Sequence, residues 1–182
     1  MSQQFALKVW SVVARYLHEG SGTVILHKTW DAKNDAFLVF PSYSGQDPDV
    51  LKPYAWMSLR HELKAPLGGH TFIRDYAEVV DTIPIQSLRA LRIVDAEHAL
   101  TPHEAERRYR EGYGLVALVL RVYHLPRAYK FYDVAEKAGE DEFVPLPFEV
   151  VLEDLTPAID DAEFERRHAQ LRAALPPAAT KE

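Results

Sequence analysis

The stretch Leu115-Val116-Ala117-Leu118-Val119-Leu120 is apolar at every position, so both faces of an extended chain would be apolar here. Strands with one solvated face alternate apolar and polar residues, whereas strands covered on both faces read as continuous apolar runs. Three polar side chains follow at its far end: Arg121, Tyr123 and His124. We therefore predict that residues 115–125 form a central strand of a sheet.

Periodicity on either side of this strand predicts a mixture of helices and strands. The run Thr101-Pro102-His103-Glu104 is a strong helix start, because Thr can cap the first turn, proline fits its first position and Glu follows. The expected helices cover 5–17, 87–94, 101 to about 112 and a segment beginning at Asp160. The expected strands cover 23–27, 36–40, 71–80 and 148–152, with the first two paired as a hairpin.

No internal repeat or low-complexity linker divides the 182 residues. We expect one domain over 1–175 and a disordered tail at 176–182. Because strands and helices follow no regular βαβ rhythm, the fold class predicted is α+β. The sheet should be curved and mainly antiparallel, or a partial barrel, packed by about four helices. A small barrel of the PUA-like kind fits by analogy.

Composition excludes several kinds of chemistry. The chain has no cysteine, so disulfides, thiolate nucleophiles and cysteine-bound metals are excluded. No apolar run would span a membrane and no signal peptide is recognisable, so we expect a cytoplasmic protein. The P-loop, GxGxxG, HExxH and GxSxG motifs are absent. No metal site is expected, because no close pair on one helical face is found among His27, His61, His70, His98 and His103.

The net charge of −6 is concentrated in the last third of the chain. Residues 1–132 carry 16 Lys and Arg against 14 Asp and Glu, whereas residues 133–182 carry 5 against 13. A uniformly basic nucleic-acid-binding surface is therefore disfavoured. The acidic segment is either a solvated face that keeps the protein soluble or a surface for a basic protein partner.

An aromatic and polar connection follows the strand expected at 36–40. Loops held by a rigid scaffold are where binding groups collect. Its rings could stack on unpaired bases, Gln46 could read a base edge and Lys52 could contact a phosphate. The alternative is a lid over the core, with its polar groups bonded locally. The candidate ligand-binding residues are Tyr43, Gln46, Lys52, Tyr54 and Trp56, with Glu78, Arg121 and Tyr123 from two strands around a shared cleft.

The enzymatic alternative is a metal-dependent nuclease. Asp49 followed by Glu62 and Lys64 matches the spacing of PD-(D/E)xK nucleases, in which two carboxylates hold Mg²⁺ and a lysine positions the attacking water. This chemistry needs Glu62 and Lys64 on one face of a strand. Pro66 ends any such strand at once, so two acids and a lysine in a surface loop remain the other interpretation.

Several short blocks occur in a fixed order over about residues 5–130: Ala6-Leu7-Lys8-Val9-Trp10, Val24-Ile25-Leu26-His27-Lys28, Phe37-Leu38-Val39-Phe40-Pro41-Ser42-Tyr43 with Gln46, Leu51-Lys52-Pro53, Tyr76-Ala77-Glu78-Val79-Val80 and Leu120-Arg121-Val122-Tyr123-His124-Leu125-Pro126. In order and spacing they resemble the bacterial domain of unknown function 1802 family. The resemblance implies an association with restriction-endonuclease-like domains, and so a role in restriction–modification or DNA defence. It supplies no catalytic residues.

The chain also departs from that family. The family tends to have Arg-Lys-Gly-Gly after the second block and a His before the Gln, where this chain has His27-Lys28-Thr29-Trp30 and Gly45. Loss of that His makes catalysis less expected. The leading hypothesis is therefore a non-enzymatic module that recognises nucleic acid or a nucleotide-like ligand, serving a nuclease on another chain. The alternatives are the nuclease itself and a protein-interaction domain acting through residues 133–182.

Overall fold

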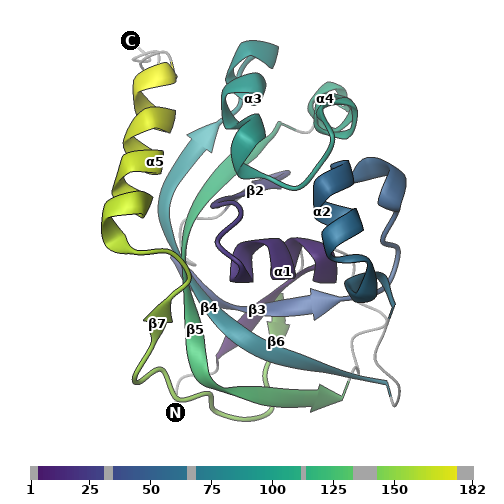
Figure 1. Cartoon of the computed structure of the whole chain (residues 1–182), viewed down its shortest axis with the longest axis vertical. Helices are drawn as coiled ribbons and strands as arrows, with labels where there is room; N and C mark the ends of the chain where they lie inside the picture. Colours follow the sequence, from purple (N-terminus) through teal and green to yellow (C-terminus); the bar gives the residue numbers. More distant parts are fainter. Residues whose placement is uncertain (1–3, 31–34, 65–68, 112–113, 133–142, 176–182) are drawn as a thin grey trace.

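The computed structural model describes residues 4–30, 35–64, 69–111, 114–132 and 143–175. Within these ranges seven strands form one open, curved sheet, accompanied by five α-helices and three short 3₁₀-helices (Figure 1). The α+β fold class is confirmed. The strands are β1 (Phe5–Trp10), β2 (Val24–His27), β3 (Ala36–Ser42), β4 (His70–Pro84), β5 (Val116–Tyr132), β6 (Phe143–Pro145) and β7 (Thr156–Pro157). The helices are α1 (Ser11–His18), η1 (Pro48–Val50), α2 (Pro53–Ser58), η2 (Arg60–Leu63), α3 (Leu88–Val94), η3 (Asp95–Glu97), α4 (Pro102–Arg110) and α5 (Asp161–Ala174).

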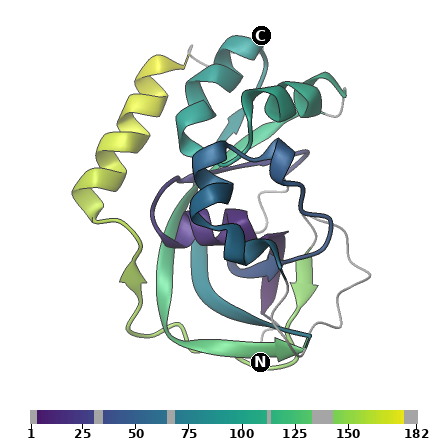
Figure 2. The same ribbon diagram turned by 45° about the vertical axis from the view of Figure 1, so that its right-hand side comes forward.

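The sheet has the order β2-β5-β4-β3-β1-β6, and β7 pairs with β5 off this path. Neighbouring strands are antiparallel except for the parallel pair β1 and β3. The long β4–β5 ribbon changes register between Ile73 and Asp75 and again between Val79 and Asp81. Such bulges bend and twist a strand pair. The ribbon accordingly curves around α1, which lies inside the bend (Figures 1 and 2).

The central strand predicted over 115–125 is confirmed as part of β5. Its side chains from Ala117 to Leu120 are at most 1% exposed, and β5 lies between β2 and β4. Other local signals are confirmed too. Thr101 caps α4 by accepting a hydrogen bond from the Glu104 N–H, and Asp160 caps α5 in the same way from the Glu163 N–H.

The first predicted helix is wrong in its first half, because residues 5–10 form β1. The side chains from Ala6 to Val9 are at most 3% exposed, so they are covered all round and not along one stripe. Backbone pairing with β3 on one edge and β6 on the other outweighs the helical periodicity. The helix proper begins at Ser11.

Two strand predictions are also wrong. The segments 24–27 and 36–42 do not form a hairpin, because β2 pairs with β5 and β3 pairs with β1 and β4. The edge of β5 buries the apolar β2 more completely than a two-stranded hairpin would. Residues 148–152 form no strand, since the Val150 N–H and carbonyl bond to the Gln4 side-chain amide and Val151 and Leu152 are exposed. The intervening loop 31–34 and the tail 176–182 lie outside the described residues.

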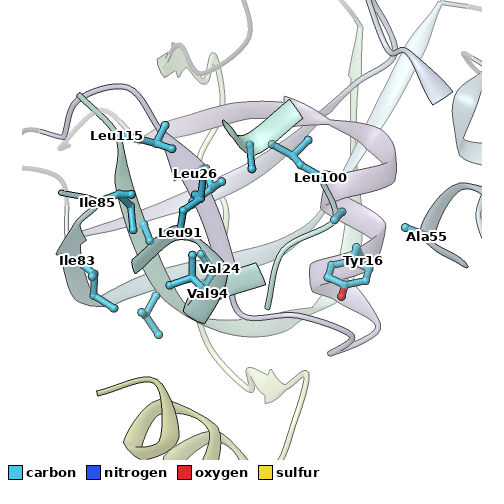
Figure 3. Packing of buried hydrophobic residues seen from close by; sticks show 14 of the residues in the cluster. Tyr16, Val24, Leu26, Ala55, Ile83, Ile85, Leu91, Val94, Leu100 and Leu115 are labelled. Atoms are coloured by element: carbon cyan, nitrogen blue, oxygen red, sulfur yellow. The ribbon is translucent and has the colours of Figure 1, made fainter. Parts of the chain in front are cut away.

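The largest apolar cluster fills the space between the sheet and its helices (Figure 3). It joins side chains from β2, β4 and β5 to others from α1, α3 and α5, so these helices are fixed to one side of the sheet. Members that show this are Tyr16, Val24, Leu26, Ile83, Leu91, Val94 and Leu171. A second cluster packs α1 against β1, β3 and β5, and a third includes Ile73 of β4, Phe131 of β5 and Val144 of β6. None of the described helices has the length and apolar character that a membrane crossing requires.

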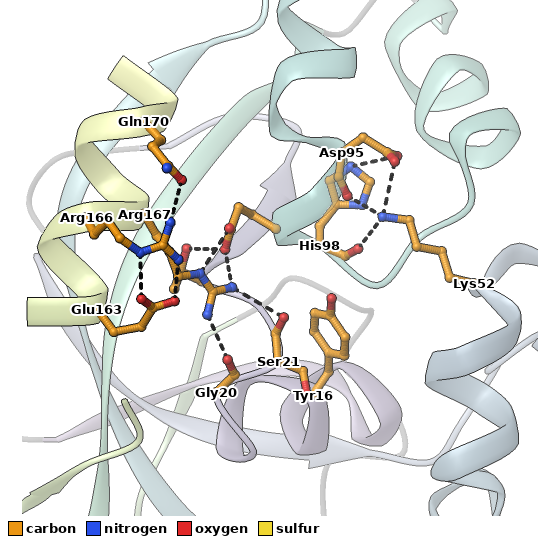
Figure 4. A network of polar contacts seen from close by, with 12 residues as sticks. Tyr16, Gly20, Ser21, Lys52, Asp95, His98, Glu163, Arg166, Arg167 and Gln170 are labelled. Atoms are coloured by element: carbon orange, nitrogen blue, oxygen red, sulfur yellow. Dashed lines mark hydrogen bonds and ion pairs between the residues drawn. The ribbon is translucent and has the colours of Figure 1, made fainter. Parts of the chain in front are cut away.

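Arg167 is one of the polar residues that hold helix α5 on the fold, in addition to apolar packing (Figure 4). The Arg167 guanidinium donates to both carboxylate oxygens of Glu97, to the Gly20 carbonyl at 2.8 Å and to the Ser21 carbonyl at 3.3 Å. The side chains of Arg167 and Glu97 are each only 12% exposed. The acidic last third is therefore integrated into the fold where it is described.

We expect Arg167→Ala to lower the free energy of unfolding by about 2–4 kcal/mol, because Glu97 would keep a largely buried charge without its partner. Urea denaturation measures this as a lower midpoint at an unchanged slope. Arg166→Ala is the matched control, since exposed Arg166 pairs with Glu163 on its own helix and should change stability by less than ~1 kcal/mol. Equal losses in both variants would contradict the role of Arg167.

Candidate functional site

A polar cleft of about 330 Å³ opens between α1, η2 and β4. The bend of the sheet places α1 on its concave side (Figure 2), and the connection after β3 brings η2 against the first turn of α1, where the Ser11 hydroxyl donates to the Glu62 carbonyl. The cleft therefore combines segments far apart in the sequence. Its lining includes three cations (Arg15, Lys64, Arg74), two carboxylates (Glu62, Asp75), two histidines (His18, His61) and two aromatic rings (Tyr43, Phe72).

A histidine–aspartate–histidine cluster lies at one wall of the cleft. The Asp75 Oδ1 atom is 2.8 Å from Nδ1 of His18 and 2.9 Å from Nδ1 of His124. The two imidazole rings are 4.2 Å apart between centroids. Asp75 and His124 face each other in register on β4 and β5, and His18 is the last residue of α1. Among the described residues, this is the group of three whose ligand atoms are close enough to hold a metal ion.

Sequence reasoning missed this cluster because its members have no diagnostic spacing. His18 lies 57 residues before Asp75, and His124 lies 49 residues after it. Neither His18 nor His124 has another histidine at a short spacing, so neither indicates a metal pair in the sequence. The available signal was the position of His124 at the polar end of the central strand, opposite the alternating strand that contains Asp75.

Tyr43, a residue predicted to bind ligand, does line the cleft. Its hydroxyl donates a hydrogen bond of 3.4 Å to Glu62, and His61 lies 3.4 Å from the other oxygen of the same carboxylate. Burial, aided by the Glu62 charge, raises the pKa of Tyr43 above its ordinary value. The Tyr43 hydroxyl therefore stays protonated at neutral pH and remains a hydrogen-bond donor.

Gln46 and Lys52, predicted as ligand contacts, are bonded within the fold. The Gln46 amide accepts from the Val12 N–H at 3.0 Å and donates to the Glu62 carbonyl at 3.0 Å, which ties the first turn of α1 to η2. The Lys52 ammonium donates to the carbonyls of Asp95 and His98 and lies 3.4 Å from the Asp95 carboxylate (Figure 4). Lys52 is 7% exposed. Both residues fit the lid interpretation.

The other predicted ligand contacts do not line the cleft. Tyr54 is exposed and its hydroxyl is 3.0 Å from that of Tyr16, whereas Trp56 packs against the largest apolar cluster. Neither residue reaches the proposed shared site.

Glu78, Arg121 and Tyr123 lie together on β4 and β5, but apart from Gln46 and Lys52. Glu78 pairs in register with Arg121 and accepts a 3.4 Å hydrogen bond from the Tyr123 hydroxyl. Arg121 is 5% exposed, forms an ion pair with Asp161 and lies 4.7 Å from the Phe164 ring centroid. The structure therefore gives Arg121 a local role in holding α5.

The nuclease residues are only partly brought together. Glu62 and Lys64 line the cleft, but Glu62 belongs to the 3₁₀-helix η2 and not to a strand. Asp49 is exposed and lies outside the cleft. Its backbone N–H donates to the Asp47 carboxylate. The strand geometry that the PD-(D/E)xK hypothesis requires is absent at these three residues.

The fold and cleft define an α+β protein with a curved mixed sheet and a polar cleft between α1, η2 and β4. The model of the domain of unknown function family DUF1802 matches residues 6–170, so the chain belongs to this family. No curated protein matches the chain. The chain is similar to the crystal structure of a mutant ASCH protein from Zymomonas mobilis, with 12% identity, a TM-score of 0.43, and coverage of 65% of this chain and 67% of that one. A similarity this low assigns neither fold nor function.

The imidazole ring of His98, next to the Lys52 network, is buried without a hydrogen bond. It is 2% exposed, and neither ring nitrogen has a hydrogen-bond partner among the described residues. Burial, together with the nearby Lys52 ammonium, lowers the pKa of His98 to about 3. The folded chain therefore keeps His98 neutral at pH values where the unfolded chain protonates it.

The free energy of unfolding should fall as the pH drops below about 6.5, by up to ~1.4 kcal/mol per pH unit. The sign follows because only the unfolded state binds the extra proton in this range. Urea denaturation at several pH values above 5, where most carboxyl groups stay ionised, measures the slope. His98→Leu should flatten it, whereas the exposed-site control His103→Leu should not. A wild-type slope in His98→Leu would refute this account.

Proposed function

We propose that the protein is a module that recognises nucleic acid or a nucleotide-like ligand, and that this ligand binds in the polar cleft. One observation carries the proposal: aromatic rings and three permanent cations line the same cleft, in a chain whose net charge is −6. The cations outnumber the two carboxylates there, although acidic residues outnumber basic ones in the chain.

The lining supplies the two contacts that a nucleotide needs. Guanidinium and ammonium groups bind phosphate oxygens. Arg74 and Lys64 are both exposed, so their charged groups are accessible to a phosphate. Aromatic side chains stack on bases irrespective of sequence. Phe72 already lies 5.4 Å from the Arg74 guanidinium, so ring and cation form one surface. The volume of about 330 Å³ is within the range of small-ligand pockets.

This site differs from the one expected from the sequence. Tyr43 keeps its proposed role, but Lys64 and Arg74 replace Lys52 and Gln46 as polar contacts, since the latter two are occupied within the fold. We retain a non-enzymatic, cytoplasmic role beside a nuclease in DNA restriction or defence as part of the proposal. Its support is the resemblance of the sequence blocks.

Fluorescence anisotropy with short single-stranded DNA and RNA tests the proposal. The double variant Lys64→Ala and Arg74→Ala should bind at least ~10-fold more weakly. The slope of the logarithm of affinity against the logarithm of salt concentration should become shallower by about 0.7 for each lost phosphate contact. Tyr43→Ala should weaken the binding free energy by about 1–3 kcal/mol, the contribution of one base stacked on this ring. These losses are expected with either polymer, because the contacts are to phosphates and ring faces.

Arg89→Ala is the control, since Arg89 is exposed on α3 and does not line the cleft. It should leave the affinity unchanged. An equal loss in Arg89→Ala would indicate non-specific attraction to the surface. Absence of binding by the wild type to oligonucleotides and to mononucleotides would reject the proposed function.

A further inference from the structure

We propose that His18, Asp75 and His124 bind one divalent first-row transition-metal ion of the Zn²⁺ or Fe²⁺ type at the wall of the polar cleft. Two imidazole nitrogens and one carboxylate oxygen form a ligand set that such ions favour, whereas Mg²⁺ and Ca²⁺ prefer oxygen alone. This inference does not depend on the proposed recognition function, because metal binding needs no other ligand.

Two separations within the cluster are close to those around a shared ion, and all the ligand atoms lie within 4.8 Å of one another. Ligands bound at ~2.1 Å in neighbouring positions of an octahedral or tetrahedral site lie roughly 3.0–3.4 Å apart. Here Oδ1 of Asp75 is 2.8 Å and 2.9 Å from the two Nδ1 atoms, so small outward shifts would admit the ion. Without metal, each Nδ1–H donates to Asp75. With metal, each Nδ1 lone pair would bind the ion and each neutral ring would carry its proton on Nε2.

The charge balance of Asp75 also favours a cation. The Asp75 side chain is 8% exposed, and its ion-pair partners among the described residues are the two histidines alone. A buried carboxylate is costly unless an opposite charge lies beside it, and no Lys or Arg of the described chain is paired with this one. A divalent ion would supply that charge while leaving both imidazoles neutral.

The backbone holds the three ligands in place and leaves a path for entry. Asp75 and His124 are register partners beside the bulge of the β4–β5 ribbon, and the last turn of α1 supplies His18. The histidine side chains are 25% and 30% exposed, so the cluster is reached from solvent. His18 and Asp75 also line the cleft. Three protein ligands leave at least one coordination position for water or for a molecule bound there.

Titration of the full chain, stripped of metal by a chelator, with Co²⁺ tests the inference. We expect one Co²⁺ per chain with visible d–d absorption, and displacement of Co²⁺ by Zn²⁺. Asp75→Asn keeps the side-chain size but removes the charge, and His18→Gln changes a partly exposed helix end. Each should weaken binding on the order of 100-fold or more, because loss of groups outside the ligand sphere alone costs ~10–100-fold.

His103→Gln is the control, since His103 is exposed on α4 and outside the cluster. It should bind Co²⁺ as the wild type does. Circular dichroism establishes whether each variant is folded. If Asp75→Asn does not fold, the Co²⁺ affinity of His18→Gln decides the outcome. Wild-type affinity in a folded cluster variant, or no Co²⁺ and Zn²⁺ uptake by the wild type, would overturn the metal site. Oligonucleotide binding is measured separately, so it can fail or succeed independently.

Discussion

The pairing of β4 with β5 is the constraint on which the rest of the molecule depends. The first part of β5, residues 116–120, is apolar on both faces, so it must lie inside the sheet, and β4 pairs with β5 over almost its whole length. Two bulges in this ribbon then set the curvature that encloses α1. The same register places Asp75 opposite His124 and within reach of His18 at the end of α1. Fold and cluster are thus consequences of one strand pairing.

Features with local causes could be predicted from the sequence, and features set by distant pairing could not. The caps at Thr101 and Asp160 depend on residues within one turn, and the buried run at 115–120 needs only its own composition. Residues 5–10 form a strand because they pair with β3 and β6, which are remote in sequence. Apolar residues at helical spacing also suit a strand covered on both faces, so the periodicity alone could not distinguish them.

The candidate site shows the same division. Tyr43 was predictable because a ring directly after a buried strand is held at the edge of the sheet, and it does line the cleft. Gln46 and Lys52 follow the same strand, but their polar groups satisfy backbone groups of α1, Glu62, Asp95 and His98. A buried donor or acceptor left unpaired costs more than a typical hydrogen bond contributes. Residue type therefore indicates what a side chain can bind, while the fold decides what it already binds.

The contrast between Asp75 and Glu97 shows why charge balance separates a structural carboxylate from a candidate ligand. Glu97 is buried to a similar degree, but the bidentate Arg167 guanidinium neutralises it and the Thr23 hydroxyl donates a further bond of 2.9 Å. Asp75 has two imidazoles, which are weaker partners unless protonated. A permanent ion pair that holds a helix is satisfied without any ligand. A carboxylate whose described partners are ionisable rings beside an open cleft retains the capacity to bind a cation, and this asymmetry makes the His18, Asp75 and His124 cluster the more informative of the two.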